Sequence, residues 1–347
     1  MQSCVPVSGR TMTDTAPGSE KSDKTSSWYD ACETAAKQLE ECIPHHYRSR
    51  TFPGILGDIK ALSPRKALSL INRKKGLGRQ YACLYLSQGI DGGRGYQACA
   101  AEALASVTGS DIRHIINGRI LDVGCAVGVT AGVLGLDGVT GFDLFTDLLG
   151  AAQMVDAITG RHNRYVTADM TRSWPFANSF DTVVCGLVCH HLKQQHDIVT
   201  FFSEANRVMK TGGHLVLTLP SGSVAFPEQL DEIVSALEEF GFTADRELCG
   251  LVISTDSPHA LFWMFVIVAR KVSDGQSGVF INPGFGFHLY RTPVTRVEKG
   301  KRARSTALAD RKVKHAAFLL IPLDILLTQH GKTVLVYENI TALPDDT

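Results

Sequence analysis

The chain has 347 residues, of which 44% are hydrophobic and 20% are charged, and this composition excludes disorder along its whole length. Lys plus Arg and Asp plus Glu both number 35, so there is no net charge to draw the protein onto nucleic acid or an anionic membrane. Binding of either kind would need a local basic patch, and the balance therefore argues against a nucleic-acid partner.

The first 27 residues are rich in Ser, Thr, Gly and Lys and contain no apolar run long enough for a signal-peptide core. We expect residues 1–27 to form a flexible arm, because their few apolar side chains cannot offset the entropy of ordering them. The most apolar later stretches, 261–269 and 316–327, are shorter than the roughly 20 residues of a membrane helix. We therefore expect a cytoplasmic protein without membrane contact.

Residues 28–111 have the pattern of a helical region. Apolar side chains recur at helical spacing from Trp28 to about Val107, as in Ala31, Ala35 and Leu39. Prolines and glycines divide the stretch into three or four helices. Residues 28–111 are therefore predicted to form a helical region, which the family resemblance given below implies to be a cap over the acceptor pocket.

Short apolar runs alternate with amphipathic stretches over residues 112–272. The runs that predict strands are 120–123, 139–143, 165–168, 180–187, 214–219, 247–254 and 261–269. The stretches that predict helices between them are 147–159, 195–209 and 227–240. Such alternation predicts an α/β fold, doubly wound around a mostly parallel seven-stranded sheet with helices on both faces.

Residues 273–347 are expected to form a C-terminal appendage. The segment is glycine-rich at 275–286, basic at 296–314, and apolar only at 316–327 and 333–337. It either packs on the α/β domain or contributes to a partner surface, and the sequence leaves both alternatives open. A homodimer is left open as well.

Nine cysteines are scattered without the paired spacing of a disulfide framework or zinc knuckle, which indicates free thiols in a reducing cytosol. Residues 185–191, with two cysteines and two histidines, contain zinc-ligand residue types. They lack a second ligand pair at a recognisable spacing. Apolar packing at a strand end is the preferred interpretation, and we expect no metal.

The strongest functional signal is the run Ile-Leu-Asp-Val-Gly-Cys-Ala-Val-Gly at residues 120–128. A buried strand here leads into a turn whose glycines let the backbone approach a ligand closely. We expect Ala126, between Gly124 and Gly128, to keep a negative φ, and the helix that follows to be short. By itself such a turn is weak evidence for a ligand.

Asp143 strengthens this signal because it ends the second predicted strand. An acidic side chain about 20 residues past a glycine turn lies where it can accept hydrogen bonds from both ribose hydroxyls. Turn and carboxylate together predict a ligand that contains a nucleoside.

These features, together with Ala168-Asp169 after the third predicted strand, resemble the class I S-adenosylmethionine-dependent methyltransferases. Residues 174–184, the run His190-His191-Leu192 and residues 204–217 extend the resemblance to about 160 residues. It is closest to the small-molecule group typified by quinone-biosynthesis methyltransferases. The resemblance implies a Rossmann-like fold, S-adenosylmethionine as cofactor, and methyl transfer as the reaction.

The resemblance also implies residue roles at the methionine end of the cofactor. Asp122 stands at the first acidic position of the family pattern. The backbone groups of the turn would surround the methionine part, and those residues are Gly124, Cys125, Ala126 and Gly128. Gly186 and Leu187, after the fourth strand, would face the sulfonium and the acceptor.

Other roles concern the adenosine end. Asp143 would bind the ribose, with Leu144 against the adenine. Asp169 would meet the adenine amino group, with Met170 beside the ring. A nicotinamide or flavin cofactor would instead need a Gly-x-Gly-x-x-Gly turn for its pyrophosphate, and residues 124–128 read Gly-x-Ala-x-Gly.

His190 and His191 are the candidate catalytic residues. They follow the fourth predicted strand, where the carboxyl ends of parallel strands form the ligand crevice. A histidine suits a general base for a hydroxyl acceptor because its pKa lies near neutrality. The alternative is that these histidines only cap the loop or pack against it.

The helical cap favours a small-molecule acceptor, such as a metabolite of secondary metabolism methylated at oxygen. One rival interpretation is a protein or nucleic-acid substrate that docks on basic residues 72–79 and 296–314. Against it, the Asn/Asp-Pro-Pro-Tyr/Phe signature of many nucleic-acid amino methylases is missing. Another is an inactive binding subunit, although Asp143 and Asp169 argue against an idle pocket.

Overall fold

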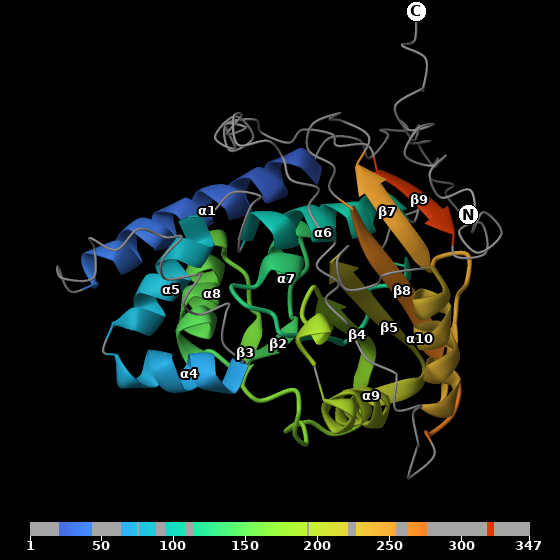
Figure 1. Cartoon of the computed structure of the whole chain (residues 1–347). Coiled ribbons are helices and arrows are strands. Elements are labelled where there is room, and N and C mark those ends of the chain that lie inside the picture. The colour runs from blue at the N-terminus through green and yellow to red at the C-terminus, as the bar shows by residue number, and fades with distance from the viewer. Residues whose placement is uncertain are drawn as a thin grey trace, which may run out of the picture.

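A computed structural model of the chain describes residues 21–43, 64–74, 76–87, 94–107, 114–192, 194–220, 227–254, 263–275 and 318–322. A twisted central sheet has helices on both faces, and further helices cover one end of it (Figure 1). The fold is therefore the α/β, Rossmann-like fold that the sequence predicts.

The described strands form one nine-stranded sheet in the order β3-β2-β1-β4-β5-β8-β7-β9, with β6 paired to β8. Strands β1 to β5 run parallel, whereas β8, β7 and β9 each run antiparallel to their neighbours. The strands are β1 (Ile120–Val123), β2 (Thr140–Asp143), β3 (Arg164–Thr167), β4 (Phe180–Gly186), β5 (Met209–Pro220), β6 (Phe242–Ala244), β7 (Gly250–Ser254), β8 (Trp263–Lys271) and β9 (Phe318–Pro322).

The sheet has two strands more than the expected seven. Of these, β6 is only three residues long and follows the turn at Gly241, so it is too short to show a period of two. Strand β9 comes from the C-terminal segment, where Gly250 pairs with Pro322 and Ser254 with Phe318. At least these five residues of the appendage therefore join the α/β domain as an edge strand.

The helices before β1 are four in the described part of the chain, in agreement with the expected helical region. We refer to them together as the helical cap, which comprises α1 (Lys21–Glu41), α4 (Pro64–Arg73), α5 (Leu77–Ser87) and α6 (Arg94–Val107). Helix α1 begins at Lys21, inside the segment expected to be an arm. The helices that follow β1 are α7 (Val129–Val133), α8 (Thr146–Thr159), α9 (Gln195–Val208) and α10 (Pro227–Glu239).

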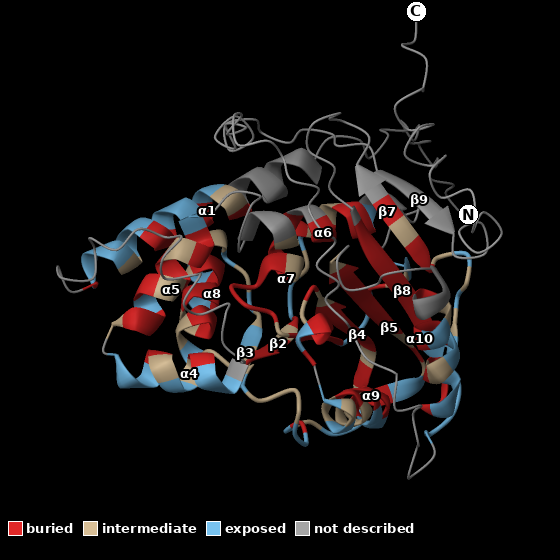
Figure 2. Ribbon diagram, viewed as in Figure 1, coloured by how far each residue is buried: buried red, intermediate tan, exposed pale blue. Residues whose placement is uncertain are grey.

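The two faces of the sheet have separate cores, and Figure 2 shows the buried residues concentrated on the sheet and on the inner sides of the helices. On one face α9 and α10 bury a cluster that includes Phe201, Phe202 and Phe240. On the other, α6 and α7 pack over Val184 and Val216. Burying one such aromatic or aliphatic side chain contributes about 1.5–3 kcal/mol, so both helical layers are held firmly to the sheet.

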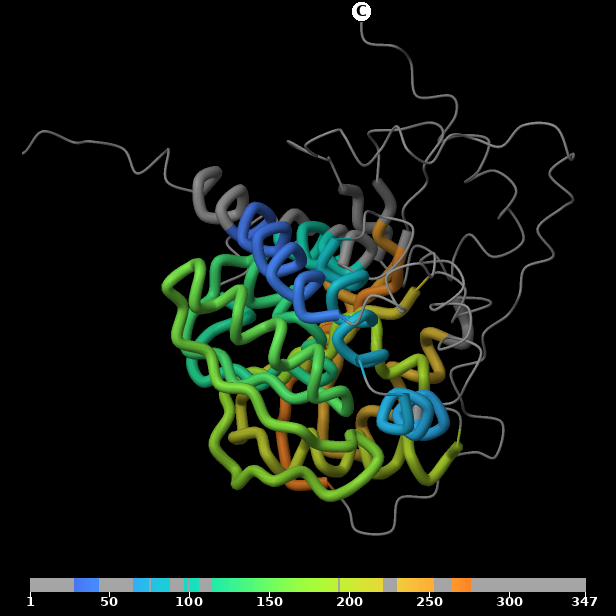
Figure 3. Tube along the Cα trace, turned by 90° about the vertical axis from the view of Figure 1, so that its left-hand side faces the viewer, coloured from blue at the N-terminus to red at the C-terminus, as the bar shows by residue number. Residues whose placement is uncertain are grey.

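The helical cap is joined to the α/β domain by α1. Trp28 is 1% exposed and lies against Gly132 of α7, where the Cβ of any other residue would overlap the indole. The Tyr29 hydroxyl donates a hydrogen bond of 2.8 Å to Glu102 of α6. Figure 3 shows α1 and α6 lying over the same end of the domain. The cap thus shares a continuous core with α7 and α8.

Two further findings concern location and thiols. No helix among the described residues has the length and apolar character to cross a bilayer. Seven cysteines are described as free thiols, six of them buried: Cys32, Cys83, Cys125, Cys185, Cys189 and Cys249.

Candidate active site

The candidate site lies at the carboxyl ends of β1, β2 and β4. Strand β1 lies between β2 and β4, and Asp122 is in register with Gly141 on one side and Val184 on the other. Because the three strands are parallel, the segments that follow them emerge at the same edge of the sheet. The turn after β1, the acidic end of β2 and Gly186 at the end of β4 are brought together there.

The turn after β1 has an unusual backbone. Gly124 has a φ of 70° and Gly128 one of 74°. At Gly124 a Cβ would lie 2.6 Å from Val188, so this position requires glycine on two counts. The helix that follows, α7, is only five residues long, as the sequence led us to expect.

Ala126 corrects one expectation. Its φ is 48°, not negative, so an alanine occupies the left-handed region at a cost of about 1–2 kcal/mol. The conformation directs its backbone N–H to the Asp143 carboxylate, at 3.1 Å from Oδ2. This hydrogen bond to a buried charged group helps to offset the strain.

The N–H groups of the turn donate within the protein. Those of Gly124 and Cys125 lie 2.8 Å and 3.2 Å from the Phe142 carbonyl oxygen, and that of Gly128 lies 2.8 Å from the Cys125 oxygen. These three N–H groups are therefore already engaged within the protein.

Asp143 is 9% exposed and holds the neighbouring loops. Its Oδ1 accepts a 2.9 Å hydrogen bond from the Phe145 N–H, while Oδ2 accepts the one from Ala126. Burial raises the pKa of Asp143, and these backbone hydrogen bonds offset only part of the rise. A carboxylate has about four acceptor positions, so Asp143 can still accept a hydrogen bond from a ribose hydroxyl. Leu144 follows at the edge, half-buried.

Asp122 is the other buried carboxylate of the site and is 2% exposed. Burial raises its pKa to about 7, although a hydrogen bond with the Thr130 hydroxyl opposes the shift. No described residue donates to its Oδ2. A buried acceptor without a donor costs about 1–3 kcal/mol, so a donor from a ligand would be stabilised here.

Asp169 lies beyond β3 and contacts the helical cap. Its Oδ1 accepts hydrogen bonds from the N–H and hydroxyl of Thr171, at 2.9 Å and 2.7 Å. Its Oδ2 lies 3.4 Å from Nε of Arg65 in α4. Burial would raise the pKa of Asp169, but the bonds from Thr171 and the charge of Arg65 outweigh burial and hold it below its usual value. Met170 packs partly buried against the core.

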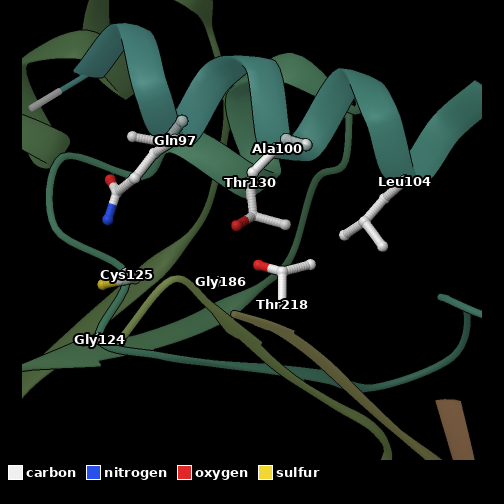
Figure 4. A pocket seen from close by; sticks show the side chains of 10 residues that line it. Gln97, Ala100, Leu104, Gly124, Cys125, Thr130, Gly186 and Thr218 are labelled. Carbon is white, nitrogen blue, oxygen red and sulfur yellow. The ribbon is translucent and has the colours of Figure 1, made fainter. Parts of the chain in front are cut away.

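A small cavity lies between α6 and the turn (Figure 4). Its volume is about 10 Å³, which is room for about one water molecule. Its walls come from α6, the turn, α7 and the ends of β4 and β5, and the residues are Gln97, Ala100, Ala101, Leu104, Gly124, Cys125, Val129, Thr130, Gly186 and Thr218. The cavity has no room for a molecule of the size of a nucleoside.

The end of β4 is a second strained segment. Leu187 has a φ of 56° and is 6% exposed, and its N–H donates to the hydroxyl of Thr218 at 3.0 Å. A bulky residue in the left-handed region is rare, and such outliers cluster at functional sites. The place of Gly186 and Leu187 beside the cofactor stays a prediction.

His190 and His191 lie in a turn of 3-10 helix, Cys189–His191, directly after β4. His190 is buried at 9% exposure, whereas His191 is exposed, and their ring centroids are 4.0 Å apart. Neither ring is among the residues that line the cavity. Of the two, His191 is the one that a substrate outside the cavity can reach.

Sequence reasoning missed the residues that the helical cap brings to the site. Burial raises the pKa values of Tyr81 and Tyr85 of α5, and the nearby charge of Asp143 raises them further. Gln97 and Arg65 likewise reach the edge from α6 and α4. No motif marks these positions, because their nearness to the turn depends on how separate helices pack.

The described residues contain no group of three or more His, Cys, Asp or Glu side chains suited to hold a metal ion. The acceptors that they do gather are the carboxylates of Asp122 and Asp143 and the carbonyl oxygens of the turn. S-adenosylmethionine carries ribose hydroxyls, an adenine amino group and an α-ammonium group, all of which donate hydrogen bonds. The chemistry of the site therefore fits that cofactor.

A glycine turn after β1 and a carboxylate after β2 of a parallel sheet define an α/β domain that binds a nucleoside-containing cofactor. Residues 121–217 match the family model described as a methyltransferase domain. The chain thus carries a class I S-adenosylmethionine-dependent methyltransferase domain and is an enzyme of this kind, with S-adenosylmethionine as its cofactor.

Solved structures similar to the chain include a protein from work on the conversion of a disulfide bond into a thioacetal group during echinomycin biosynthesis. It has a TM-score of 0.39 and 21% identity, over 50% of this chain and 81% of that one. The glycopeptide N-methyltransferase MtfA in complex with S-adenosyl-L-homocysteine gives 0.38 and 15%, over 50% and 86%.

A TehB-like S-adenosylmethionine-dependent methyltransferase from Corynebacterium glutamicum gives a TM-score of 0.35 and 20% identity. The match covers 50% of this chain and 86% of that one. No curated protein sequence matches the chain.

Proposed function

We propose that the enzyme transfers a methyl group from S-adenosylmethionine to a small-molecule metabolite, at a hydroxyl oxygen, by in-line displacement. The observation that carries this proposal is the closure of the site by the helical cap, since α6 leaves a cavity of only about 10 Å³ over the turn. A site covered by helices suits an acceptor that is enclosed with the cofactor. The sequence pattern of the chain also resembles that of the small-molecule, quinone-biosynthesis-like group, which supports the same proposal.

The proposed division is a helical cap over residues 28–111, a methyltransferase domain over 112–272 and an appendage over 273–347. In the domain, Asp143 binds the ribose with its remaining acceptor capacity, and Leu144 lies against the adenine. Asp169 accepts from the adenine amino group once Arg65 has moved, with Met170 beside the ring. These roles follow from the places of the side chains at the ends of β2 and β3.

At the other end, the turn surrounds the methionine part. Its oxygens and close surfaces come from Gly124, Cys125, Ala126 and Gly128, and Asp122 supplies a buried acceptor. The bound cofactor supplies an electrophilic methyl group on its sulfonium. Gly186 and Leu187, at the end of β4, face that group.

The residues of the chain contribute positioning and exclusion of water. Ala100 and Leu104 of α6 form an apolar wall of the cavity, so closure of α6 removes water from the site. Holding the acceptor oxygen in line with a dry methyl group lowers the barrier without a covalent intermediate.

We assign His191 as the general base that takes the proton of the acceptor hydroxyl. It follows β4 directly and is exposed, so an acceptor can reach it. His190, buried with its ring 4.0 Å from that of His191, orients the base. An ordinary histidine pKa suits proton transfer near neutral pH.

The rival acceptor is a macromolecule. Arg73 and Lys74 are exposed at the end of α4, which offers a small basic surface, and residues 296–314 lie outside the described part of the chain. We also propose that the enzyme works in the cytoplasm, that it serves secondary metabolism and that it can form a homodimer. Buried free thiols such as Cys125 and Cys185 are consistent with a reducing compartment.

The test is transfer of labelled methyl from S-adenosylmethionine into a cell extract by the full chain, with the product identified by mass. We expect label in the small-molecule fraction as an O-methyl product. Label found only in protein or nucleic acid would contradict the proposal. If no fraction of the extract becomes labelled, the chain is an inactive subunit and the proposal fails as well. The Asp143→Ala variant serves as the background control.

A further inference from the structure

Leu187 lies at the end of β4 in a backbone conformation that a bulky residue rarely takes. Its φ of 56° falls in the left-handed region, and its side chain is buried. Such a conformation persists only where the surrounding structure holds it, and it recurs at functional sites. The groups that hold Leu187 therefore decide the course of the chain at this edge of the sheet.

Thr218 holds the backbone of Leu187. It lies on β5 in register with Gly186. The Leu187 N–H is shared between two oxygens of Thr218, the carbonyl oxygen at 3.1 Å and the hydroxyl Oγ1 at 3.0 Å. The carbonyl bond continues the pairing of β4 with β5, whereas the second bond needs a side chain with a hydroxyl group at this place. Thr218 is fully buried, so solvent does not compete for that bond.

The side chain of Leu187 connects the end of β4 with helix α6. It belongs to the same core cluster as Ala100 and Leu104 of α6. These two residues of α6 also line the cavity beside the turn after β1. A change in the backbone of Leu187 is therefore expected to move two walls of the cavity, the end of β4 and α6.

Thr218 also borders the cavity directly. Figure 4 shows its side chain and that of Thr130 pointing toward each other from opposite walls of the cavity. A Cβ added to Gly186 would lie 3.9 Å from the hydroxyl oxygen of Thr218 and 3.5 Å from that of Thr130. The hydroxyl that holds Leu187 is thus next to Gly186, which in our proposed function faces the sulfonium.

We propose that Thr218 is a positioning residue for methyl transfer, which acts through Leu187 to hold the end of β4 against the methyl-bearing sulfonium. This inference rests on the proposed function, because that function puts Gly186 and Leu187 beside the sulfonium. It goes further by giving a residue of β5 a part in distinguishing the methylated cofactor from its demethylated product. The physical basis is that a backbone already held in one conformation contacts the methyl group without the cost of being ordered first.

The test compares two ligands that differ only in the methyl group and in the charge on sulfur. Isothermal titration of the full chain is carried out with S-adenosylmethionine and with S-adenosylhomocysteine. Thr218→Val keeps the shape of the side chain and removes the hydroxyl. We expect it to weaken S-adenosylmethionine about fivefold or more and S-adenosylhomocysteine less than about twofold, because only the first carries the methyl group that the end of β4 contacts.

Thr182→Val is the matched control. Thr182 lies on β4 and is also fully buried, and its hydroxyl donates to the carbonyl oxygens of Ile115 and Asn117, at 3.2 Å and 3.0 Å. Those residues precede β1, so this hydroxyl lies at the edge of the sheet opposite the cavity. The control should lower the thermal midpoint and leave the ratio of the two affinities unchanged. Thr218→Ser retains the hydroxyl and should restore the ratio of the unaltered chain.

The outcomes are distinct. In Thr218→Val, an equal loss with both ligands or no loss with either would overturn the inference and leave the cofactor assignment standing. A changed ratio in Thr182→Val, or no recovery in Thr218→Ser, would overturn it as well. Failure of the unaltered chain to bind either ligand would overturn the cofactor assignment and the inference together.

Thermal unfolding of each variant checks that the chain is folded. If Thr218→Val does not fold, Thr218→Ala replaces it with the same expectation. A loss that is selective for S-adenosylmethionine, and that is absent from both Thr218→Ser and Thr182→Val, supports the inference.

Discussion

The Asp143 carboxylate accepts a hydrogen bond from the backbone N–H of Ala126, with 3.1 Å between N and Oδ2. This bond joins the end of β2 to the turn after β1, and it forms because Ala126 takes a φ of 48°. The carboxylate at the end of β2 and the turn after β1 are therefore one structural unit. A change in either is expected to affect the other.

Ala126→Gly is expected to cost much less stability than Ala131→Gly. At residue 126 glycine avoids the cost of about 1–2 kcal/mol that a positive φ imposes on alanine, and this relief offsets the lost methyl burial and the greater entropy loss of glycine on folding. Ala131→Gly in α7 is the control, because it loses an equally buried methyl group from a helical backbone that favours alanine, and it should destabilise by about 1–2 kcal/mol. Urea denaturation measures both. Equal destabilisation by the two substitutions would contradict the assigned strain.

Asp143→Ala is expected to lower the affinity for S-adenosylhomocysteine about 100-fold, because the ribose loses a charged acceptor and the turn loses its anchor. Asp143→Asn keeps one acceptor and should lose less. Calorimetric titration measures both. The control, Asp156→Asn, alters another buried carboxylate, which lies on α8 and accepts a hydrogen bond from Asn163. It should lower stability without a comparable loss of affinity. Unchanged binding in Asp143→Ala would argue against the site.

Asp122 predicts a pH dependence of stability. Its pKa is about 7 when folded and 3.8 as the ordinary value, so between these pH values the folded protein holds a proton that the unfolded chain releases. The free energy of unfolding therefore falls as pH rises through this window, by up to about 4 kcal/mol. Asp122→Asn removes the effect. The free energy of unfolding of this variant should therefore increase, relative to that of the unaltered chain, from pH 5 to pH 7.

Denaturation at several pH values checks this expectation. The control is Asp137→Asn, because backbone hydrogen bonds from His162 lower the pKa of that exposed carboxyl, so it should not change the slope above pH 5. If the free energy of unfolding varies with pH in the same way for Asp122→Asn and for the unaltered chain, the pKa of Asp122 is not raised.

Much of the α/β domain could be predicted from the sequence, because its signals are local. The strand at residues 120–123 has the bounds expected, and the helices at 146–159 and 195–208 differ from expectation by one residue. Each depends on a run of apolar residues and a turn next to it. Strand β9 could not be predicted, since its pairing with β7 joins residues about 70 positions apart.

The site was predictable in the same degree. Asp143 and the glycine turn could be found by their spacing along the chain, and Asp122 by the resemblance of its strand to the family pattern. The left-handed Ala126 could not, because its conformation goes together with a hydrogen bond to Asp143, a residue 17 positions further along the chain. Gln97 and Arg65 could not either, since only the packing of α6 and α4 brings them to the edge.

Arg65→Gln is expected to raise the affinity for S-adenosylhomocysteine a few-fold. Arg65 lies 3.4 Å from Asp169 Oδ2 and would compete for that oxygen with the adenine amino group that we propose Asp169 to bind. Its side chain is 57% exposed, so the ion pair contributes less than about 1 kcal/mol to stability. Titration calorimetry measures the change, with Lys66→Gln on the same helix as control. A lower affinity would indicate that Arg65 instead supports the bound cofactor.

His191→Ala is expected to lower kcat with the identified acceptor by about 10²–10⁴ and to leave the affinity for S-adenosylhomocysteine unchanged. His196→Ala, an exposed histidine 2.9 Å from Asp197 on α9, is the control and should leave both unchanged. Full activity of His191→Ala would move the base to another group.

The most direct measurement of the central claim is a crystal structure of the full chain grown with S-adenosylhomocysteine. We predict density for the ligand at the carboxyl edge of β1, β2 and β4, with the ribose at Asp143 and the amino acid end between the turn and α6. Density at another place in the protein, with this edge closed as before, would contradict the account.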